Sequence, residues 1–155
     1  MGRILGIDVG TRTLGLALSD ETGTVALPFQ VLRRGGLRRD LERLAAIVAD
    51  RGVTEAVVGL PLEMAGGRGA MADEADVVAE ALASRCAIPV HRWDERLTTV
   101  AAERMLIEAD VSRKRRKQVV DKIAAALILQ GWLDRRNLPG GGSLPPVPPP
   151  PGENG

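Results

Sequence analysis

The sequence predicts an α/β protein built on a mixed five-stranded sheet with helices on both faces. Residues 3–32 contain three apolar runs separated by turn residues, which is typical of an antiparallel meander. Two later apolar runs alternate with segments of helical periodicity, as in βαβ units with parallel strands. Apolar residues make up 45% of the 155-residue chain, which suits one domain with a substantial core.

The meander comes first. Strands are predicted over Arg3–Val9, Leu14–Ser19 and Val25–Leu32, with a glycine-containing turn between each pair. Pro28 has no N–H to donate to a neighbouring strand, so the third strand is expected at an edge of the sheet or at a bulge.

The βαβ part follows. Leucines recur at helical spacing through Leu37–Arg51, and Gly52 is a natural helix end. The continuous apolar run Ala56–Leu60 predicts a strand that is buried on both faces. Further on, the pattern predicts a helix through Ala75–Leu82, a fifth strand over Pro89–Trp93, and helices over Thr98–Ala109 and Lys117–Arg135.

The composition changes at Asn137. Residues 137–155 are rich in glycine and proline and contain little apolar mass, so they cannot bury enough surface to become ordered. We therefore expect a folded domain over residues 1–136, followed by a disordered tail over 137–155. A single cysteine, Cys86, allows no internal disulfide, and no apolar run approaches the length of about 20 residues that spans a membrane. Both features favour a cytoplasmic protein.

Two acidic positions fall where α/β sheets usually hold their sites. Asp8 lies near the carboxyl end of the first predicted strand, within an otherwise apolar run. Asp94 and Glu95 directly follow the fifth strand, at the same carboxyl edge of the sheet. Each acid taken alone could equally serve as a turn or helix cap, because carboxylates are common at both places.

A basic block precedes the last predicted helix. Its five consecutive cations stand at the end of the helix dipole that disfavours positive charge, so helix stability does not explain them. Contact with phosphate would explain them, and a solvated charged loop is the alternative; Asp121 follows one turn later, at the edge of the apolar stripe. The net charge is only +1, and three aromatic residues in the chain are too few for a base-stacking platform. The block consists of Arg113, Lys114, Arg115, Arg116 and Lys117.

Three carboxylates from separate elements predict a metal site if they converge. Asp8, Glu95 and Asp121 would repel one another unless cations lay between them. Oxygen-only ligands suit Mg²⁺ or Mn²⁺, and two such ions can support hydrolysis of a phosphodiester. The single histidine, His91, cannot build a zinc site and is expected to be structural or to lie at the surface.

Four segments, taken in order, resemble the YqgF/RuvX family of ribonuclease H-like proteins. They are GIDVGTRTLGLALSD (6–20), VVGLPLEMAGGRG (57–69), DERLTT (94–99) and SRKRRKQVVDKIAAALILQGWLD (112–134). The resemblance covers about residues 3–135. It implies a ribonuclease H-like fold with the order β-β-β-α-β-α-β-α, which agrees with the pattern of the elements.

The resemblance also implies a function and a site. Members are described as Holliday junction resolvases and as pre-16S rRNA nucleases, and the family's acids correspond to Asp8, Glu95 and Asp121. The expected activity is metal-dependent cleavage of structured RNA, in maturation of the 5′ end of the 16S rRNA precursor. The sequence departs from the related resolvase RuvC, which offers an acid after the fourth strand where this chain has Gly59-Leu60-Pro61. We expect Arg12 and Arg68 to join the basic block in binding nucleic acid.

Three other readings remain open. The same site could cleave junction DNA, because basic residues bind both kinds of backbone. The protein could instead be a non-catalytic factor of ribosome assembly or nucleic-acid binding, acting beside the small subunit as a monomer or homodimer. The segment DVGTRTLG (8–15) also resembles the phosphate loop of actin-like kinases, but those proteins clamp nucleotide between two domains, and this chain supplies one.

Overall fold

The computed structural model describes residues 2–61, 69–97 and 116–139, with the backbone alone over 116–121. The predicted helix over 98–109, residues 113–115 of the basic block and Arg68 lie outside the described residues. So does most of the predicted tail, and the domain boundary at 136/137 therefore stays a prediction.

The five predicted strands form one mixed sheet. Their order across the sheet is β3-β2-β1-β4-β5, so β1 occupies the centre. β1 is antiparallel to β2 and parallel to β4, and β5 is parallel to β4, as the sequence pattern indicated. The strands are β1 (Arg3–Val9), β2 (Thr13–Ser19), β3 (Ala26–Arg33), β4 (Val53–Leu60) and β5 (Val90–Asp94).

Pro28 is expected on an edge strand or at a bulge, and the structure shows both. β3 is an edge strand, and its register with β2 shifts between Leu16 and Ala17, so that Ala17 pairs with Pro28 while Leu16 pairs with Gln30. The extra residue at this bulge is Phe29. A proline and a bulge on an edge strand both hinder pairing with the strand of another molecule.

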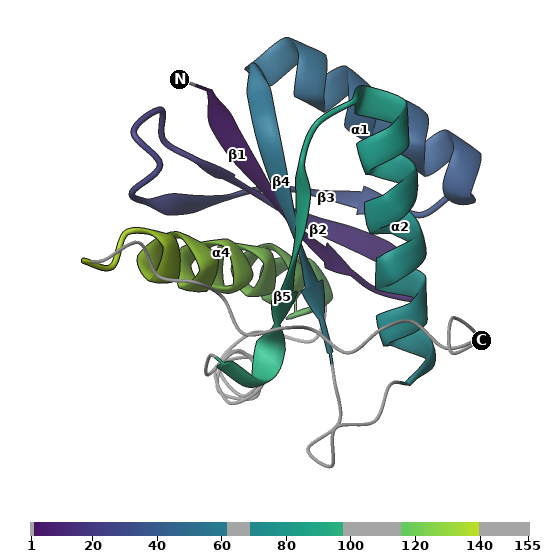
Figure 1. The fold of residues 1–155 in the computed structure, drawn as a ribbon. Coiled ribbons are helices and arrows are strands. Elements are labelled where there is room, and N and C mark those ends of the chain that lie inside the picture. The colour runs from purple at the N-terminus through teal and green to yellow at the C-terminus, as the bar shows by residue number, and fades with distance from the viewer. Residues whose placement is uncertain (1, 62–68, 98–115, 140–155) are drawn as a thin grey trace, which may run out of the picture.

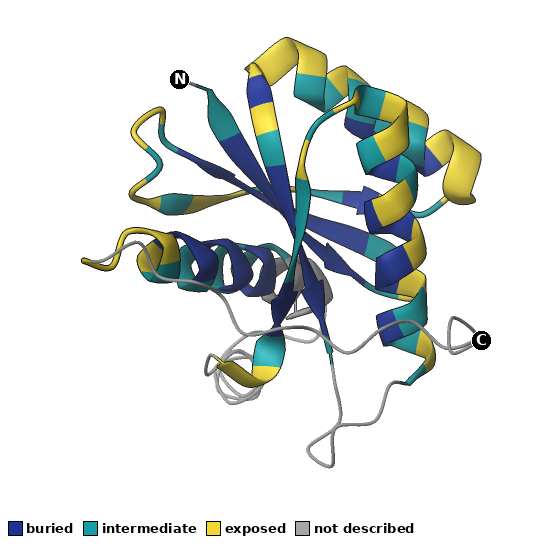
Figure 2. Cartoon of the chain, in the orientation of Figure 1, coloured by how far each residue is buried: buried dark blue, intermediate teal, exposed yellow. Residues whose placement is uncertain are grey.

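Helices cover both faces of the sheet. α1 (Leu37–Arg51) and α2 (Ala70–Cys86) lie together on one face, and α4 (Arg116–Arg136) covers the other (Figure 1). A short 3₁₀ helix, η1 (Glu95–Leu97), follows β5 directly. None of the helices in the described ranges is long and apolar enough to cross a membrane. The central strands β1 and β2 and most of β4 are buried between the helical layers, whereas the edge strand β3 is largely exposed (Figure 2).

α4 approaches the sheet closely because two strand positions that face it are glycines. A Cβ atom added at Gly6 would lie 2.7 Å from Leu129 Cβ and 3.0 Å from the carbonyl oxygen of Ala125. A Cβ at Gly59 would lie 2.4 Å from Ile128 Cδ1. The glycines thus let the helix backbone and its branched side chains rest directly on β1 and β4.

The C-terminal half of α4 also holds the turn between β2 and β3. The Gln130 side-chain amide accepts from Ala26 N–H at 2.9 Å and donates to the Thr24 carbonyl at 2.9 Å. The Asn137 amide donates to the Gly23 carbonyl at 3.0 Å. These bonds fix the direction of the helix, with its C-terminus beside the first residues of β1.

Substitution of Gly6 by alanine is expected to destabilise the protein by about 1–3 kcal/mol, because the new methyl group would overlap atoms of α4 that have no freedom to rotate away. The free energy of unfolding, measured by denaturant titration, tests this. Gly35→Ala is the matched control, since the added Cβ would meet only the flexible side chain of Arg39. Equal stability of the two variants would contradict the proposed close packing.

Candidate acidic site at the carboxyl edge of the sheet

Asp8 lies on the central strand and faces α4. Successive strand residues alternate between the two faces of a sheet, so Asp8 shares the face of Gly6, on which α4 packs. The residue is only 8% exposed. Its position one residue before the end of β1 confirms the predicted placement at the carboxyl edge.

Glu95 reaches the same face from the neighbouring strands. It begins η1, directly after β5, and its Oε2 atom would lie 3.1 Å from a Cβ added at Gly59. Ile7 pairs with Val58 in the parallel ladder, so the next residues of the two strands, Asp8 and Gly59, are level with each other. The two carboxylates therefore occupy adjacent places at one end of the sheet, and the missing side chain at Gly59 leaves room for the second.

Asp94, the neighbour of Glu95, is held by other contacts and is not a candidate metal ligand. Arg96 binds it with both its backbone N–H, at 2.9 Å, and its guanidinium group, whose Nη2 lies 2.7 Å from Oδ2. Burial raises the pKa of Asp94, but the hydrogen bonds from Arg96 outweigh burial and hold the pKa below its usual value. The ionised Asp94 thus fixes the turn at the start of η1, from which Glu95 projects.

Asp121 lies at the end of α4 that points toward these two acids. The opposite end of the helix contacts the β2–β3 turn and, through Arg136, Glu55 near the start of β4. Position 121 is one helical turn before Ala125, whose carbonyl group meets Gly6. The side chain of Asp121 lies outside the description, so its part in the site stays a prediction.

The donor set fits a hard divalent cation. The acidic site, defined here as Asp8 and Glu95 with Asp121 predicted as the third member, offers carboxylate oxygens, which Mg²⁺ and Mn²⁺ prefer. Within the described residues, no group of three potential ligands comes close enough to hold a metal by itself. Asp121 is the predicted further ligand of a metal centre here.

The predicted basic contacts are only partly described. Arg12 is exposed in the turn between β1 and β2, close in sequence to Asp8. Arg116 and Lys117 lie in the first turn of α4, as expected, with their backbones alone described. The sequence pattern did not single out Arg34, a further cation that contacts the turn between β1 and β2.

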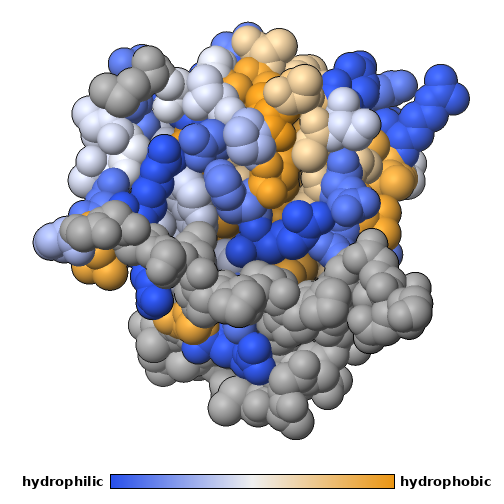
Figure 3. All heavy atoms as spheres, viewed as in Figure 1, coloured by the Kyte–Doolittle hydropathy of each residue, from blue (hydrophilic) through white to orange (hydrophobic). Residues whose placement is uncertain are grey.

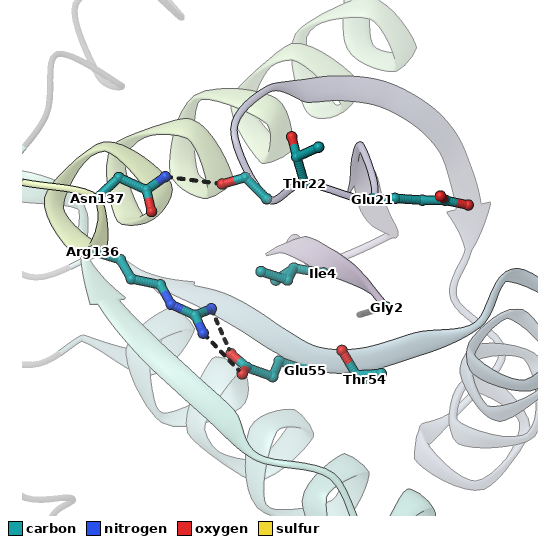
Figure 4. Close-up of a pocket in the computed structure, with 9 residues that line it drawn as sticks. Gly2, Ile4, Glu21, Thr22, Thr54, Glu55, Arg136 and Asn137 are labelled. Atoms are coloured by element: carbon teal, nitrogen blue, oxygen red, sulfur yellow. Dashed lines mark hydrogen bonds and ion pairs between the residues drawn. The ribbon is translucent and has the colours of Figure 1, made fainter.

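A surface pocket of about 400 Å³ lies at the other end of the sheet (Figure 4). Glu55 and Arg136 form an ion pair at 3.1 Å on its wall. His91 is stacked on Trp132 with ring centroids 4.7 Å apart, and its Nε2 lies 3.2 Å from Oε2 of the same Glu55. The pocket belongs to the amino ends of β1 and β4 and is separate from the acidic site.

Comparisons with known proteins place the chain among nucleases. Among curated proteins, one from Symbiobacterium thermophilum is 53% identical over 86% of this chain and 93% of its own length. One from Moorella thermoacetica is 52% identical over 86% of this chain and 95% of its own length. Both carry the name "Putative pre-16S rRNA nuclease".

The solved structure of Thermus thermophilus RuvC in complex with a Holliday junction substrate superposes with a TM-score of 0.58. It is 14% identical in sequence and covers 86% of this chain and 96% of its own, so it supports the ribonuclease H-like fold. A family model described as "RuvX: Holliday junction resolvase" matches residues 2–135. Since that match spans nearly the whole domain, the chain belongs to the RuvX family.

Proposed function

We propose that this protein is a metal-dependent endonuclease that hydrolyses phosphodiester bonds in the precursor of 16S rRNA, at its 5′ end. The observation that supports this most directly is the placement of Asp8 and Glu95 side by side on one face of the sheet, with position 121 of α4 directed toward them. The relatives that share about half of its residues are named for the same substrate.

Mg²⁺ or Mn²⁺, as a pair of ions, would activate the attacking water and stabilise the leaving oxygen. Asp8, Glu95 and Asp121 would hold the ions in this proposal, and Asp8 is a buried residue at the carboxyl edge of the central strand. Because carboxylates crowded together repel one another, the acidic site favours a divalent cation over an empty state.

The surface of the protein suits binding through the phosphate backbone. The chain has only three aromatic residues, and none offers an open ring: Trp93 and Trp132 are each 3% exposed, and the guanidinium of Arg51 lies 4.9 Å from the ring centroid of Phe29. Hydrophilic side chains cover much of the described face in Figure 3. We infer that Arg12, Arg68 and the basic block bind phosphates of the RNA backbone. The protein then recognises the RNA by its shape.

The proposed setting is the cytoplasm, where the protein meets precursor rRNA on the assembling small ribosomal subunit, as a monomer or homodimer. Cleavage of four-way junction DNA is the second candidate function, and the description of the family model favours it. Incubation of the purified protein with precursor rRNA and with junction DNA, with and without Mn²⁺, decides between them. Absence of cleavage of either substrate would favour the non-catalytic binding factor.

Removal of any one acid should abolish most of the activity. Asp8→Asn, Glu95→Gln and Asp121→Asn are each expected to lower turnover by about 100-fold or more, because each removes a charged ligand of the proposed ions. Stability should not fall, since the substitutions relieve repulsion. Cleavage rates with Mg²⁺ or Mn²⁺ and thermal melting curves give the two measurements.

The control for these variants is Glu21→Gln, which neutralises an exposed acid of the pocket at the other end of the sheet. It should cleave at the wild-type rate. If the three acid variants also keep near-wild-type rates, the acidic site is not catalytic.

Neutralising part of the basic block should weaken binding in a salt-dependent way. In Arg115→Ala/Arg116→Ala/Lys117→Ala, the slope of log affinity against log salt is expected to become shallower by about 0.7–0.9 for each lost phosphate contact, since fewer counterions are released. Dissociation constants for precursor rRNA across a salt series measure this slope.

A matched triple variant carries the same loss of charge on the opposite face of the sheet. Arg38→Ala/Arg39→Ala/Arg85→Ala removes three exposed cations from α1 and α2. Its salt slope should equal that of the wild type. An equal change of slope in both triple variants would show that general charge, and not the basic block, governs binding.

A further inference from the structure

Arg34 is a nearly buried cation that joins three parts of the structure. It follows the last residue of β3, and its side chain is 11% exposed. Its Nε atom lies 3.2 Å from Oδ2 of Asp40 in α1, and its Nη1 atom lies 2.9 Å from Oε1 of Glu74 in α2. The same Nη1 donates to the carbonyl oxygen of Gly10 at 3.1 Å.

The contact with Gly10 is one of two by which Arg34 holds the β1–β2 turn. The backbone N–H of Arg34 donates to the Arg12 carbonyl at 2.8 Å. Within the turn, the Gly10 N–H donates to the Thr13 carbonyl at 2.8 Å. One residue therefore binds both the first and the third residue of a short turn.

The position of this turn matters because Asp8 lies two residues before Gly10. The strand that carries Asp8 ends at Val9, so the direction of the chain beyond it is set by the turn. Arg12, predicted to bind phosphate, is itself in the turn. A shift of the Gly10 carbonyl would thus displace a proposed metal ligand and a proposed phosphate contact together.

Asp40 shows how firmly Arg34 is held. Its side chain is 1% exposed, and it also accepts the Gly35 N–H at 2.9 Å. Asp40 thus gives the guanidinium a buried anchor in α1. The planar guanidinium contacts Asp40 through Nε and both Glu74 and Gly10 through Nη1, a fork of donors that the compact ammonium of a lysine does not reproduce.

We propose that Arg34 is a positioning residue of the acidic site: it holds the β1–β2 turn against α1 and α2 and thereby sets Asp8 and Arg12 for metal and phosphate. The inference rests on the proposed metal site. Replacement of residues that orient metal ligands without binding the metal themselves typically lowers metal affinity by about 10–100-fold.

Two variants separate this role from simple loss of folding. Arg34→Lys keeps a positive charge beside Asp40, and Arg34→Gln/Asp40→Asn removes both buried charges together. In each, amide hydrogen exchange of Gly10 in the metal-free protein should accelerate by about tenfold, and Mn²⁺ affinity, measured by electron paramagnetic resonance, should fall by about tenfold. The matched control is Arg38→Gln/Glu42→Gln, which removes an exposed ion pair of α1, the helix that carries Asp40. It should change neither the exchange rate of the Gly10 amide nor the Mn²⁺ affinity.

The outcomes distinguish this inference from the proposed function. Unchanged Gly10 exchange and unchanged Mn²⁺ affinity in folded Arg34 variants would overturn the role of Arg34 and leave the nuclease proposal standing. Weaker Mn²⁺ binding in these variants would support the role of Arg34 even if the wild-type protein cleaved neither RNA nor DNA, a result that would refute the proposed function alone.

Discussion

The packing of α4 on two glycines of the sheet determines where the acids can meet. At Gly6 the strand has no side chain, so Leu129 Cβ and the Ala125 carbonyl of the helix lie directly against it, and at Gly59 the side chain of Ile128 fills the corresponding space. A side chain at Gly6 would meet these fixed atoms of the helix and push α4, with position 121, away from the sheet. The same absence at Gly59 gives the Glu95 carboxylate its place. The absence of side chains at Gly6 and Gly59 thus determines both the position of α4 and the place of the Glu95 carboxylate.

Around this constraint, the charged residues divide into those that face the site and those that support it. Asp8 and Glu95 face it, while Asp94 is bound by Arg96 and Asp40 by Arg34. The supporting acids accept hydrogen bonds from guanidinium and backbone N–H groups and are tied to the turns that they hold. Asp8 and Glu95 lie instead at the carboxyl edge of the sheet, where we propose that a cation binds.

Much of the architecture could be predicted from the sequence because it depends on local patterns. The apolar run in Arg3–Val9 and the helical spacing in Leu37–Arg51 specify their elements without reference to the rest of the chain, and both are confirmed with the predicted bounds. β4 begins three residues before its apolar run, at Val53, because Thr54 and Glu55 continue the strand toward the pocket. The alignment of Asp8 with Glu95 and the clamp by Arg34 could not be predicted in this way. They depend on the register of parallel strands and on contacts between side chains far apart in the chain.

The bonds that α4 makes with the β2–β3 turn bear on how the molecule assembles during synthesis. Gln130 and Asn137 bind residues 104–114 positions earlier, so these contacts cannot form until almost all of the domain has left the ribosome. Until then the α4 face of β1, with Asp8 on it, has no cover. Contacts of such high sequence separation also slow folding, because a long loop must close before they form. The acidic site is therefore among the last parts of the nascent chain to take shape, and a ribosome still translating this protein carries it without a finished site.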